Sequence, residues 1–388
     1  MGFFQSIISS WAGYKKIRGL PKSEIDIAFF SEGNAYHRFL LPVMRQLTCN
    51  YQQKIFYITS DPNDVLLESK EANIEAIFVG WQLALALTFL HIKAKVFVMT
   101  MPDLGVFHLK RSGGTQHYVY LQHSLVSTHM VYKPKAFDNY DSIFCAGPHQ
   151  IQEIREWERI CQLKKKRLYK HGYAPLDEII SHEASKKRHS NPAKKTNVLL
   201  APSWGPNGFL ENGCIDLIES LLSNDYSVCL RVHPQSWKTS HTLIRKINSA
   251  FFSDSNFNFD DQASTYSSLI EADIMISDWS GVAFEFALGL ARPVIFINVP
   301  KKINNERFTE LKAEPIEILA RKTLGIVVEP DDMFSVVELI PKLIAKSFFE
   351  KQSIEKYRDK NVFNLGKSAQ IGSEILYKIL QKELQKYK

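Results

Sequence analysis

The stretch from residue 274 to residue 297 constrains the fold of this chain more than any other segment. It begins and ends with short apolar runs, 274–276 and 294–297, which are typical of strands in a parallel sheet covered on both faces. Between the runs the residues predict a turn and a short helix. Ser280 stands at the expected N-cap position, and Gly281 would let a ligand approach the backbone. A strand–helix–strand unit of this kind indicates an α/β fold.

The turn in this stretch is suited to a nucleotide phosphate. A helix start presents unpaired N–H groups and the positive end of the helix dipole. Glu285 lies about one helical turn further on, where it would accept hydrogen bonds from sugar hydroxyls. A plain packing unit with an ordinary serine cap is the alternative, and the phosphate interpretation depends on agreement with the features below.

The whole chain of 388 residues alternates short apolar strands with helical patterns, which predicts two halves that each contain a doubly wound parallel sheet. We expect domains at residues 1–170 and 196–388, the second ending in an amphipathic helix at 368–388, with a basic segment at 171–195 between them. The expected strands are 25–30, 54–59, 74–79, 95–100, 118–122, 142–145, 196–201, 228–232, 274–277, 294–297 and 325–328. The other expected helices are 36–47, 82–91, 149–163, 215–222, 264–270, 282–290 and 333–346.

The net charge of +7 is concentrated in one segment. Residues 163–195 hold ten Lys or Arg against three Asp or Glu, and the 38 basic and 38 acidic residues elsewhere balance. We expect residues 164–195 and the apolar N-terminus to contact an anionic membrane surface, with a solvated linker as the alternative. The segment lacks interleaved exposed aromatic residues and no known nucleic-acid-binding pattern accompanies it, so a nucleic-acid partner is not expected.

Cysteine usage and hydropathy predict a cytoplasmic protein that is soluble or peripherally attached, and we expect it to be peripheral on the inner face of the cell membrane. No basic n-region precedes the apolar N-terminus, and the apolar stretch 76–92 is shorter than the roughly 20 residues that span a bilayer. The five cysteines are scattered without a Cys-x-x-Cys pair, which favours reduced thiols and argues against a metal site. They are Cys49, Cys145, Cys161, Cys214 and Cys229.

Candidate catalytic residues follow two of the expected strands. His123 comes directly after 118–122, where an imidazole could take a proton from an attacking hydroxyl. A histidine that only bonds a backbone carbonyl is the commoner alternative. Arg231 and His233 lie two apart, so on a strand they would share a face and clamp a pyrophosphate. A structural ion pair of Arg231 is the alternative.

Two further loops supply candidate binding residues. Ser203 and Trp204 follow the strand at 196–201 and are candidates for nucleotide or ribose binding, together with Glu285. Ser277 and Asp278 follow the strand at 274–277 and join Arg231, Ser280 and Gly281 as candidates for the donor phosphates. Ligands of open α/β sheets bind beyond the carboxyl ends of strands, which is where these loops lie.

Several common motifs are absent from the sequence. Residues 30–34, Phe-Ser-Glu-Gly-Asn, replace a Gly-x-Gly-x-x-Gly, which disfavours a dinucleotide-dependent dehydrogenase. There is no Walker A pattern, no Gly-x-Ser-x-Gly elbow, no His-Glu-x-x-His and no Asp-x-Asp. We therefore expect neither a cofactor nor an essential metal.

Together these motifs resemble the CDP-glycerol glycerophosphotransferase family, whose members build teichoic acids and related capsule polymers. The similarity covers residues 115–300, and its more specific parts are Arg-x-His-Pro and Ser-Asp-x-Ser. The motifs are Tyr-Leu-Gln-His-Ser at 120–124, Asp-Ser-Ile-Phe-Cys-Ala-Gly-Pro at 141–148, Gly-Tyr-Ala-Pro-Leu-Asp at 172–177, Leu-Ala-Pro-Ser-Trp at 200–204, Leu-Arg-Val-His-Pro at 230–234 and Ser-Asp-Trp-Ser-Gly-Val-Ala-Phe-Glu at 277–285.

The resemblance implies a GT-B-like fold of two facing Rossmann-type domains. It also implies transfer of a polyol phosphate from a CDP-activated donor to a hydroxyl of a lipid-linked or polymer acceptor. His123 would match the catalytic base. Arg231, His233, Ser277, Asp278 and Ser280 would lie around the phosphates and the glycerol end of the donor.

One departure leaves the donor open. The family usually has Trp-His-Gly-Thr around the first histidine, whereas this chain has Gln-His-Ser-Leu at 122–125. A GT-B glycosyltransferase that uses a UDP- or CMP-sugar is therefore an alternative. A catalytically silent binding protein of envelope assembly and a sugar-nucleotide epimerase are the other two.

Overall fold

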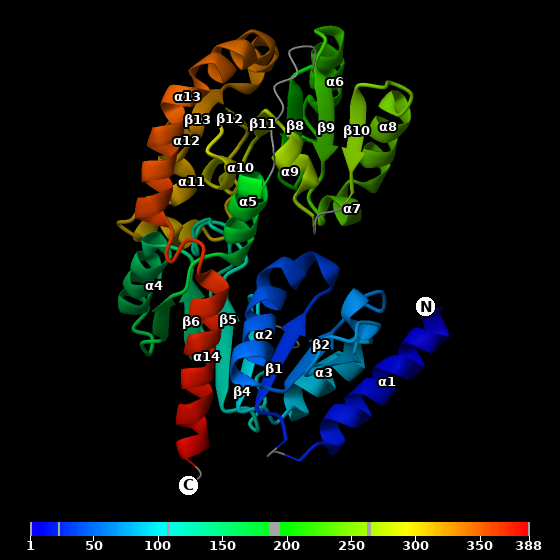
Figure 1. The fold of residues 1–388 in the computed structure, drawn as a ribbon, viewed down its shortest axis with the longest axis vertical. Coiled ribbons are helices and arrows are strands. Elements are labelled where there is room, and N and C mark those ends of the chain that lie inside the picture. Colours follow the sequence, from blue (N-terminus) through cyan, green and yellow to red (C-terminus); the bar gives the residue numbers. More distant parts are fainter. Residues whose placement is uncertain (1, 22–23, 107–108, 186–194, 262–264, 387–388) are drawn as a thin grey trace.

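Two parallel sheets form the framework of the protein (Figure 1). The structure, a computed structural model, describes residues 2–21, 24–106, 109–185, 195–261 and 265–386. The first sheet has the order β3-β2-β1-β4-β5-β6-β7 and the second β10-β9-β8-β11-β12-β13. The strands are β1 (Ile27–Ser31), β2 (Ile55–Thr59), β3 (Ile74–Phe78), β4 (Val96–Met99), β5 (His117–Leu121), β6 (Ser142–Cys145), β7 (Arg167–Lys170), β8 (Asn197–Ala201), β9 (Ser227–Arg231), β10 (Phe257–Asp260), β11 (Ile274–Ser277), β12 (Val294–Ile297) and β13 (Gly325–Val328).

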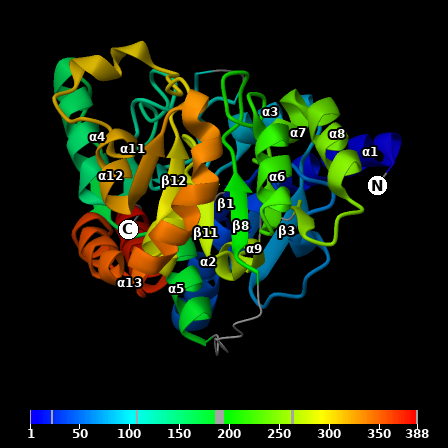
Figure 2. The same cartoon turned by 90° about the horizontal axis from the view of Figure 1, so that it is seen from above.

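Helices cover both faces of each sheet, which explains the uninterrupted apolar strands. In β1, Ile27 and Phe29 enter one core while Ala28 and Phe30 enter the core on the opposite face. Figure 2, which looks down on the second domain, shows α6, α7 and α8 together at one side and α11, α12 and α13 at the other. The α-helices are α1 (Phe3–Gly19), α2 (His37–Tyr51), α3 (Gln82–His91), α4 (Pro148–Ile160), α5 (Ala174–Ser185), α6 (Cys214–Ser223), α7 (Ser236–Thr239), α8 (His241–Phe251), α9 (Ser267–Glu271), α10 (Val282–Leu290), α11 (Ile316–Leu319), α12 (Arg321–Leu324), α13 (Val336–Asn361) and α14 (Ser368–Gln385).

One hydrophobic core runs through both domains. It includes Leu40 of α2 in the first domain, Phe286 of α10 in the second, and Ile179 of α5 between them. Helix α5 packs on α10 and also contacts α2. Because interiors are close-packed, this shared core ties the position of one sheet to that of the other.

The predicted fold class, an α/β protein with two parallel sheets flanked by helices, is confirmed. Strands β6, β11, β12 and β13 and helices α3 and α10 have the predicted bounds, and most other predicted elements differ at one or both ends. Strands β7 and β10 and helices α1, α5, α7, α8, α11 and α12 were not predicted. The edge strand β7 was missed because its four residues, Arg-Leu-Tyr-Lys, are polar at both ends and are not fully buried.

The structure corrects two expectations about the organisation of the chain. Helix α14 was assigned to the second domain but packs on α2 and β4 of the first, as Figure 1 shows. The basic segment at 171–195 was expected to be a connection, yet residues 174–185 form α5 within the shared core. Its basic residues 186–188 and 194 lie outside the described residues. Sequence composition had suggested a linker because the many charged residues of this segment made the apolar side of α5 hard to recognise.

Candidate active site

His123 follows β5 and lies among aromatic rings. The rings of Tyr36, Phe39, Tyr120 and Tyr132 surround it, with centroids 5.8 to 6.2 Å from the imidazole. Nδ1 lies 2.9 Å from the Tyr120 hydroxyl and Nε2 lies 3.4 Å from the Tyr132 hydroxyl. Burial lowers the pKa of His123 to about 4, so the ring is neutral at pH 7. If Nδ1 carries the proton toward Tyr120, the lone pair of Nε2 is available to accept one.

His233 follows β9 in the second domain and is also neutral. Burial lowers its pKa to about 3, assisted by the charge of Lys302 and, when protonated, of His123. That effect of His123 places the two histidines within electrostatic reach of each other, one from each domain. Nδ1 of His233 accepts a hydrogen bond of 3.1 Å from the backbone N–H of Gln235. The neutral ring therefore carries its proton on Nε2, where it can donate to a ligand.

Lys302 is a candidate that the sequence reasoning missed. Its Nζ lies 3.5 Å from the centroid of the Trp204 ring and donates a hydrogen bond of 3.1 Å to the Trp204 carbonyl. Burial lowers the pKa of Lys302 to about 7, against the opposing charges of Asp278 and Glu211. The available signal was the Lys-Lys pair shortly after β12, at the same sheet edge as the other candidate loops.

Trp204 contacts both the ammonium of Lys302 and the neutral ring of His233. Its ring centroid lies 6.2 Å from that of His233, and its other contact is the ammonium of Lys302. We use the name donor cluster for Trp204, His233 and Lys302, which come from the loops after β8, β9 and β12. A cation, a hydrogen-bond donor and an aromatic face together suit a nucleotide with its phosphates.

Asp278 holds the Trp204 loop through both oxygens of its carboxylate. Its carboxylate accepts hydrogen bonds from the backbone N–H of Ser203 at 2.7 Å and of Phe209 at 3.0 Å, and the residue is buried. The neighbouring Ser277 hydroxyl donates to the Ala201 carbonyl at 2.7 Å. These hydrogen bonds of Asp278 and Ser277 shape the site from behind. The predicted direct ligand contacts of Ser203, Ser277 and Asp278 stay predictions.

Arg231 has the structural role that was the alternative. Its guanidinium forms a buried ion pair of 2.6 Å with Asp260 and donates to the Ser268 hydroxyl and the Thr265 carbonyl. These bonds fasten β10 and the start of α9 to β9. The predicted clamp with His233 fails because β9 ends at Arg231, so the strand alternation that would align the two side chains has already stopped.

Helix α10 begins differently from the prediction. Gly281 is the N-cap, with φ −62° and ψ −24°, and the helix has no side-chain cap, so Ser280 does not serve as one. A Cβ at Gly281 would lie 3.0 Å from the Ser124 hydroxyl oxygen. Gly281 thus permits a close approach of Ser124, the residue that follows His123. The sequence had led us to expect a ligand at this position. Ser124 brings the His123 loop to the start of α10.

Glu285 does not face a sugar site. Its carboxylate lies between the domains, where Arg38 of α2 and the Tyr173 hydroxyl bind it. The predicted ribose contact is therefore replaced by an internal ion pair. Helix position alone gave the wrong role because α5 packs against α10, and Arg38 of α2 reaches the side where Glu285 projects.

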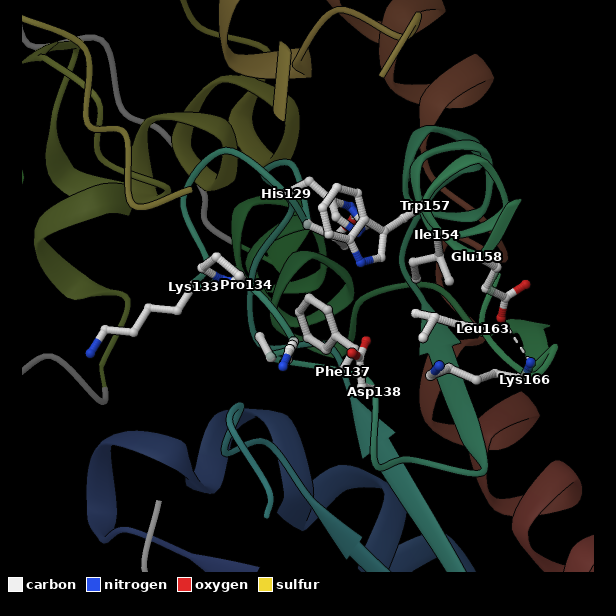
Figure 3. Close-up of a pocket in the computed structure, with 13 residues that line it drawn as sticks. His129, Lys133, Pro134, Phe137, Asp138, Ile154, Trp157, Glu158, Leu163 and Lys166 are labelled. Atoms are coloured by element: carbon white, nitrogen blue, oxygen red, sulfur yellow. Dashed lines mark hydrogen bonds between the residues drawn. The ribbon is translucent and has the colours of Figure 1, made fainter. Parts of the chain in front are cut away.

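A pocket beside the segment after His123 does not contain the candidate residues. His129, Phe137 and Trp157 are among its lining residues (Figure 3), and none of the predicted site residues lines it. Across the described ranges, no group of three or more His, Cys, Asp or Glu is arranged to hold a metal. The expectation that no metal is essential stays a prediction.

Two buried carboxylates hold the segment that follows His123. Glu317 of α11 accepts the Ser127 N–H at 3.0 Å, and Glu153 of α4 accepts the Thr128 N–H at 2.6 Å. Oε2 of Glu317 and Oε1 of Glu153 have no hydrogen-bond partner among the described residues. Burial and the charge of Glu153 raise the pKa of Glu317 to about 8, while Arg321 opposes the shift.

Replacing Glu317 by glutamine should flatten the pH dependence of stability. An unfolded glutamate ionises near pH 4.5, whereas the folded protein keeps this proton to about pH 8. Stability is therefore fully present below pH 4.5 and falls as the pH rises to 8, by at most ~5 kcal/mol. Thermal unfolding from pH 5 to 9 should show a smaller decline for Glu317→Gln than for the wild type. Glu314→Gln, an exposed control, should follow the wild type, and equal slopes in all three proteins would contradict the assignment.

The two sheets and their shared core define a two-domain, GT-B-like α/β protein. The chain matches the family described as CDP-Glycerol:Poly(glycerophosphate) glycerophosphotransferase over residues 46–305, which is more than half of its length. The chain therefore belongs to the CDP-glycerol glycerophosphotransferase family, as the motifs predicted.

Relatives of known structure share the fold. The wall teichoic acid polymerase TagF superposes with a TM-score of 0.62 at 16% identity, covering 98% of each chain. The UDP-GlcNAc 2-epimerase from Neisseria meningitidis, bound to UDP-GlcNAc, gives a TM-score of 0.54 at 12% identity, covering 92% of this chain and 99% of the other. At these identities the likeness concerns the fold alone.

A curated relative matches part of the sequence. The teichoic acid poly(glycerol phosphate) polymerase of Bacillus spizizenii (strain ATCC 23059 / NRRL B-14472 / W23) is 31% identical over 110 residues. That alignment spans 26% of this chain and 26% of the relative.

Proposed function

We propose that the protein transfers a polyol phosphate, glycerol phosphate first among the candidates, from a CDP-activated donor to a hydroxyl of a lipid-linked or polymeric cell-envelope acceptor. The observation that carries this proposal is the pair of partly buried histidines, His123 after β5 of the first domain and His233 after β9 of the second, which are both neutral at pH 7 because their pKa values are lowered. Family membership supplies the donor class, because the family description names CDP-glycerol.

The proposed reaction needs one base and a site for the leaving group. Nε2 of His123 takes the proton of the acceptor hydroxyl, and the oxygen attacks the β-phosphorus in line. The bond from that phosphorus to the bridging oxygen breaks, and CMP leaves with the electron pair. His233 and Lys302 stabilise the charge that develops on CMP.

Donor affinity should depend on Lys302. We expect Lys302→Met to raise the donor KM by about 10- to 100-fold, because a desolvated cation beside a phosphate contributes roughly 1.5–3 kcal/mol. Lys301→Met is a matched control, since Lys301 is exposed. Initial rates over a range of donor concentrations measure the effect. Equal KM values for both variants would remove Lys302 from the donor site.

A nucleotide-release assay tests the function. Purified protein is incubated with CDP-polyols, UDP-sugars and CMP-sugars, each with and without crude lipid-linked acceptor. CMP release from a CDP-polyol that requires acceptor supports the proposal. Release from a sugar nucleotide alone would replace it with a glycosyltransferase or, without acceptor dependence, an epimerase. Binding without release of any nucleotide would indicate a silent binding protein.

We also propose that the protein works at the inner face of the membrane through α1 and α3. These helices pack side by side, and four large apolar side chains on them are exposed: Phe4, Ile8, Leu83 and Leu90. Helix α1 has no acidic residue and ends with basic ones, so its charge complements an anionic bilayer. No helix in the described ranges is long and apolar enough to cross a bilayer.

The described basic residues at the start of the 164–195 segment lie away from this surface. Helix α1 packs along β3, whereas the exposed Lys164, Lys165 and Arg167 adjoin β7 at the opposite edge of the seven-stranded sheet. At ~4.8 Å between strands these edges are about 30 Å apart. We therefore assign the membrane contact to α1 and α3, and leave Lys164, Lys165 and Arg167 as a candidate contact for a polyanionic acceptor.

Removing the apolar contacts should release the protein from vesicles. We expect the double variant Phe4→Ser, Ile8→Ser to lose at least about tenfold in affinity for vesicles containing anionic lipid, as two side chains of roughly 1.5–3 kcal/mol each are deleted. Phe252→Ser is the control, because Phe252 is equally exposed but belongs to the second domain. Co-sedimentation measures binding, and a double variant that pellets like the control would place the membrane contact elsewhere.

A further inference from the structure

Glu285 and Arg38 form a buried ion pair between the domains. Arg38 belongs to α2 of the first domain and Glu285 to α10 of the second, and their side chains are 7% and 8% exposed. The guanidinium also lies 5.2 Å from the Phe39 ring centroid and 4.9 Å from that of Tyr266. Aromatic rings from both domains thus enclose the pair and keep water from it.

Tyr173 connects this ion pair to the backbone of His123. Its hydroxyl donates a hydrogen bond of 2.6 Å to Oε1 of Glu285 and lies 3.2 Å from the carbonyl oxygen of His123. Burial raises the pKa of Tyr173, so the hydroxyl keeps its proton. A single hydroxyl therefore bridges a carboxylate of the second domain and the main chain at the candidate base.

The rings around His123 belong to the same assembly. Phe39, which follows Arg38 in α2, has its ring centroid 5.9 Å from both the His123 ring and the Tyr173 ring. Any displacement of Arg38 or Tyr173 would consequently be transmitted to the His123 ring through packed atoms as well as through the hydrogen bond.

We propose that Glu285 is a positioning residue, which sets the place of His123 relative to the second domain through Tyr173 and Arg38. The second domain carries the donor cluster, so this contact determines the distance between base and donor. A base displaced by about 1 Å loses on the order of 10²-fold in rate, and donor binding need not change. The proposal rests on the transferase function proposed above.

Removal of the Tyr173 hydroxyl is the most selective test. Tyr173→Phe keeps the ring contacts and leaves the ion pair in place. We expect kcat to fall by about tenfold, with the donor KM within about twofold of the wild type. Tyr226→Phe is the matched control, because its hydroxyl bonds the Val337 carbonyl at 3.1 Å within the second domain. A wild-type kcat in Tyr173→Phe, or a loss that appears only in KM, would overturn the positioning role.

A second readout does not require turnover. Protein labelled with ¹³C at histidine Cε1 gives ring signals, and the His123 signal is identified by its loss in His123→Gln. Both Tyr173→Phe and Glu285→Gln should shift this signal, while Tyr226→Phe should not. An unshifted signal would refute the inference whether or not the protein is active. A wild-type protein that releases no CMP would refute the proposed function alone.

Discussion

His123→Gln is expected to reduce CMP release from a CDP-polyol by at least about 10²- to 10⁴-fold, with the protein still folded. The size follows from the usual contribution of a general base. Glutamine fills a similar volume among the four aromatic rings, and its amide can bond the Tyr120 hydroxyl that now contacts Nδ1. Glutamine cannot accept a proton in the relevant pH range, so only the rate of the chemical step should fall.

The pH profile gives this prediction a second signature. A base must be unprotonated, so activity should rise with pH through the pKa of the free enzyme. Burial puts that value for His123 at about 4, below the ordinary histidine value of 6.5. We therefore expect kcat/KM to be level from about pH 5 to pH 6 and to decline below that as His123 takes up a proton. It should also decline toward pH 7 and above, as Lys302 loses its proton.

A control histidine separates a specific effect from a general one. His91, at the end of α3, contacts the Tyr14 hydroxyl at 3.0 Å and has no contact with the candidate site. His91→Gln should therefore retain wild-type turnover. Near wild-type activity in His123→Gln, measured by initial rates at saturating donor, would discard the base mechanism.

Asp278→Asn should destabilise the protein and weaken donor binding together. The carboxylate accepts two backbone N–H groups, from Ser203 and Phe209, and a side-chain amide has only one oxygen to offer them. Its NH₂ group would face the other N–H, leaving a buried donor unpaired at a cost of about 2–4 kcal/mol. The loop that carries Trp204 would then lose its fixed position.

Loss of the Asp278 charge should also lower the pKa of Lys302 further. Asp278 is the first charge that opposes the lowering of the Lys302 pKa, so the variant should have a neutral amine at pH 7 more often. We expect a lower melting temperature and a donor KM raised by at least about tenfold. Asp273→Asn is the control, because the Asp273 carboxylate accepts only the Asn197 N–H, at 2.9 Å, among the hydrogen bonds found, and one amide oxygen can replace it. Thermal unfolding and donor titration of the two variants measure the difference. Equal melting temperatures and equal donor KM values would contradict the role of Asp278 in holding the Trp204 loop.

Local sequence patterns predicted most of the strands because helices cover both faces of each sheet. A strand such as Val294–Ile297 is apolar at every position, and short apolar runs between helices are visible without any tertiary information. The same logic missed β7 and the partly exposed β10, whose residues are polar where the sheet meets solvent. Helix α1 was missed for a related reason, because its apolar side chains are spread around the helix and several are exposed.

Roles of single polar residues were harder to predict than elements. Sequence order placed Arg231, Asp278 and Glu285 at strand ends or helix starts, where ligands bind in this class of fold. Each instead has buried internal partners: Asp260 for Arg231, backbone N–H groups for Asp278, and Arg38 for Glu285. A buried charge must be paired, and its partner comes from an element that is distant in the chain, so sequence spacing does not reveal it.

By itself the sequence determined the α/β class, the positions of the loops that carry His123, Trp204 and His233, and membership of the family. These depend on local hydrophobic periodicity and on short motifs, which neighbouring residues encode. Only the tertiary structure decided that α14 joins the first domain, that Lys302 meets Trp204, and that Glu285 binds Arg38 and Tyr173. Those contacts depend on how close-packed helices bring distant segments together, a property of the whole core rather than of any one stretch of the chain.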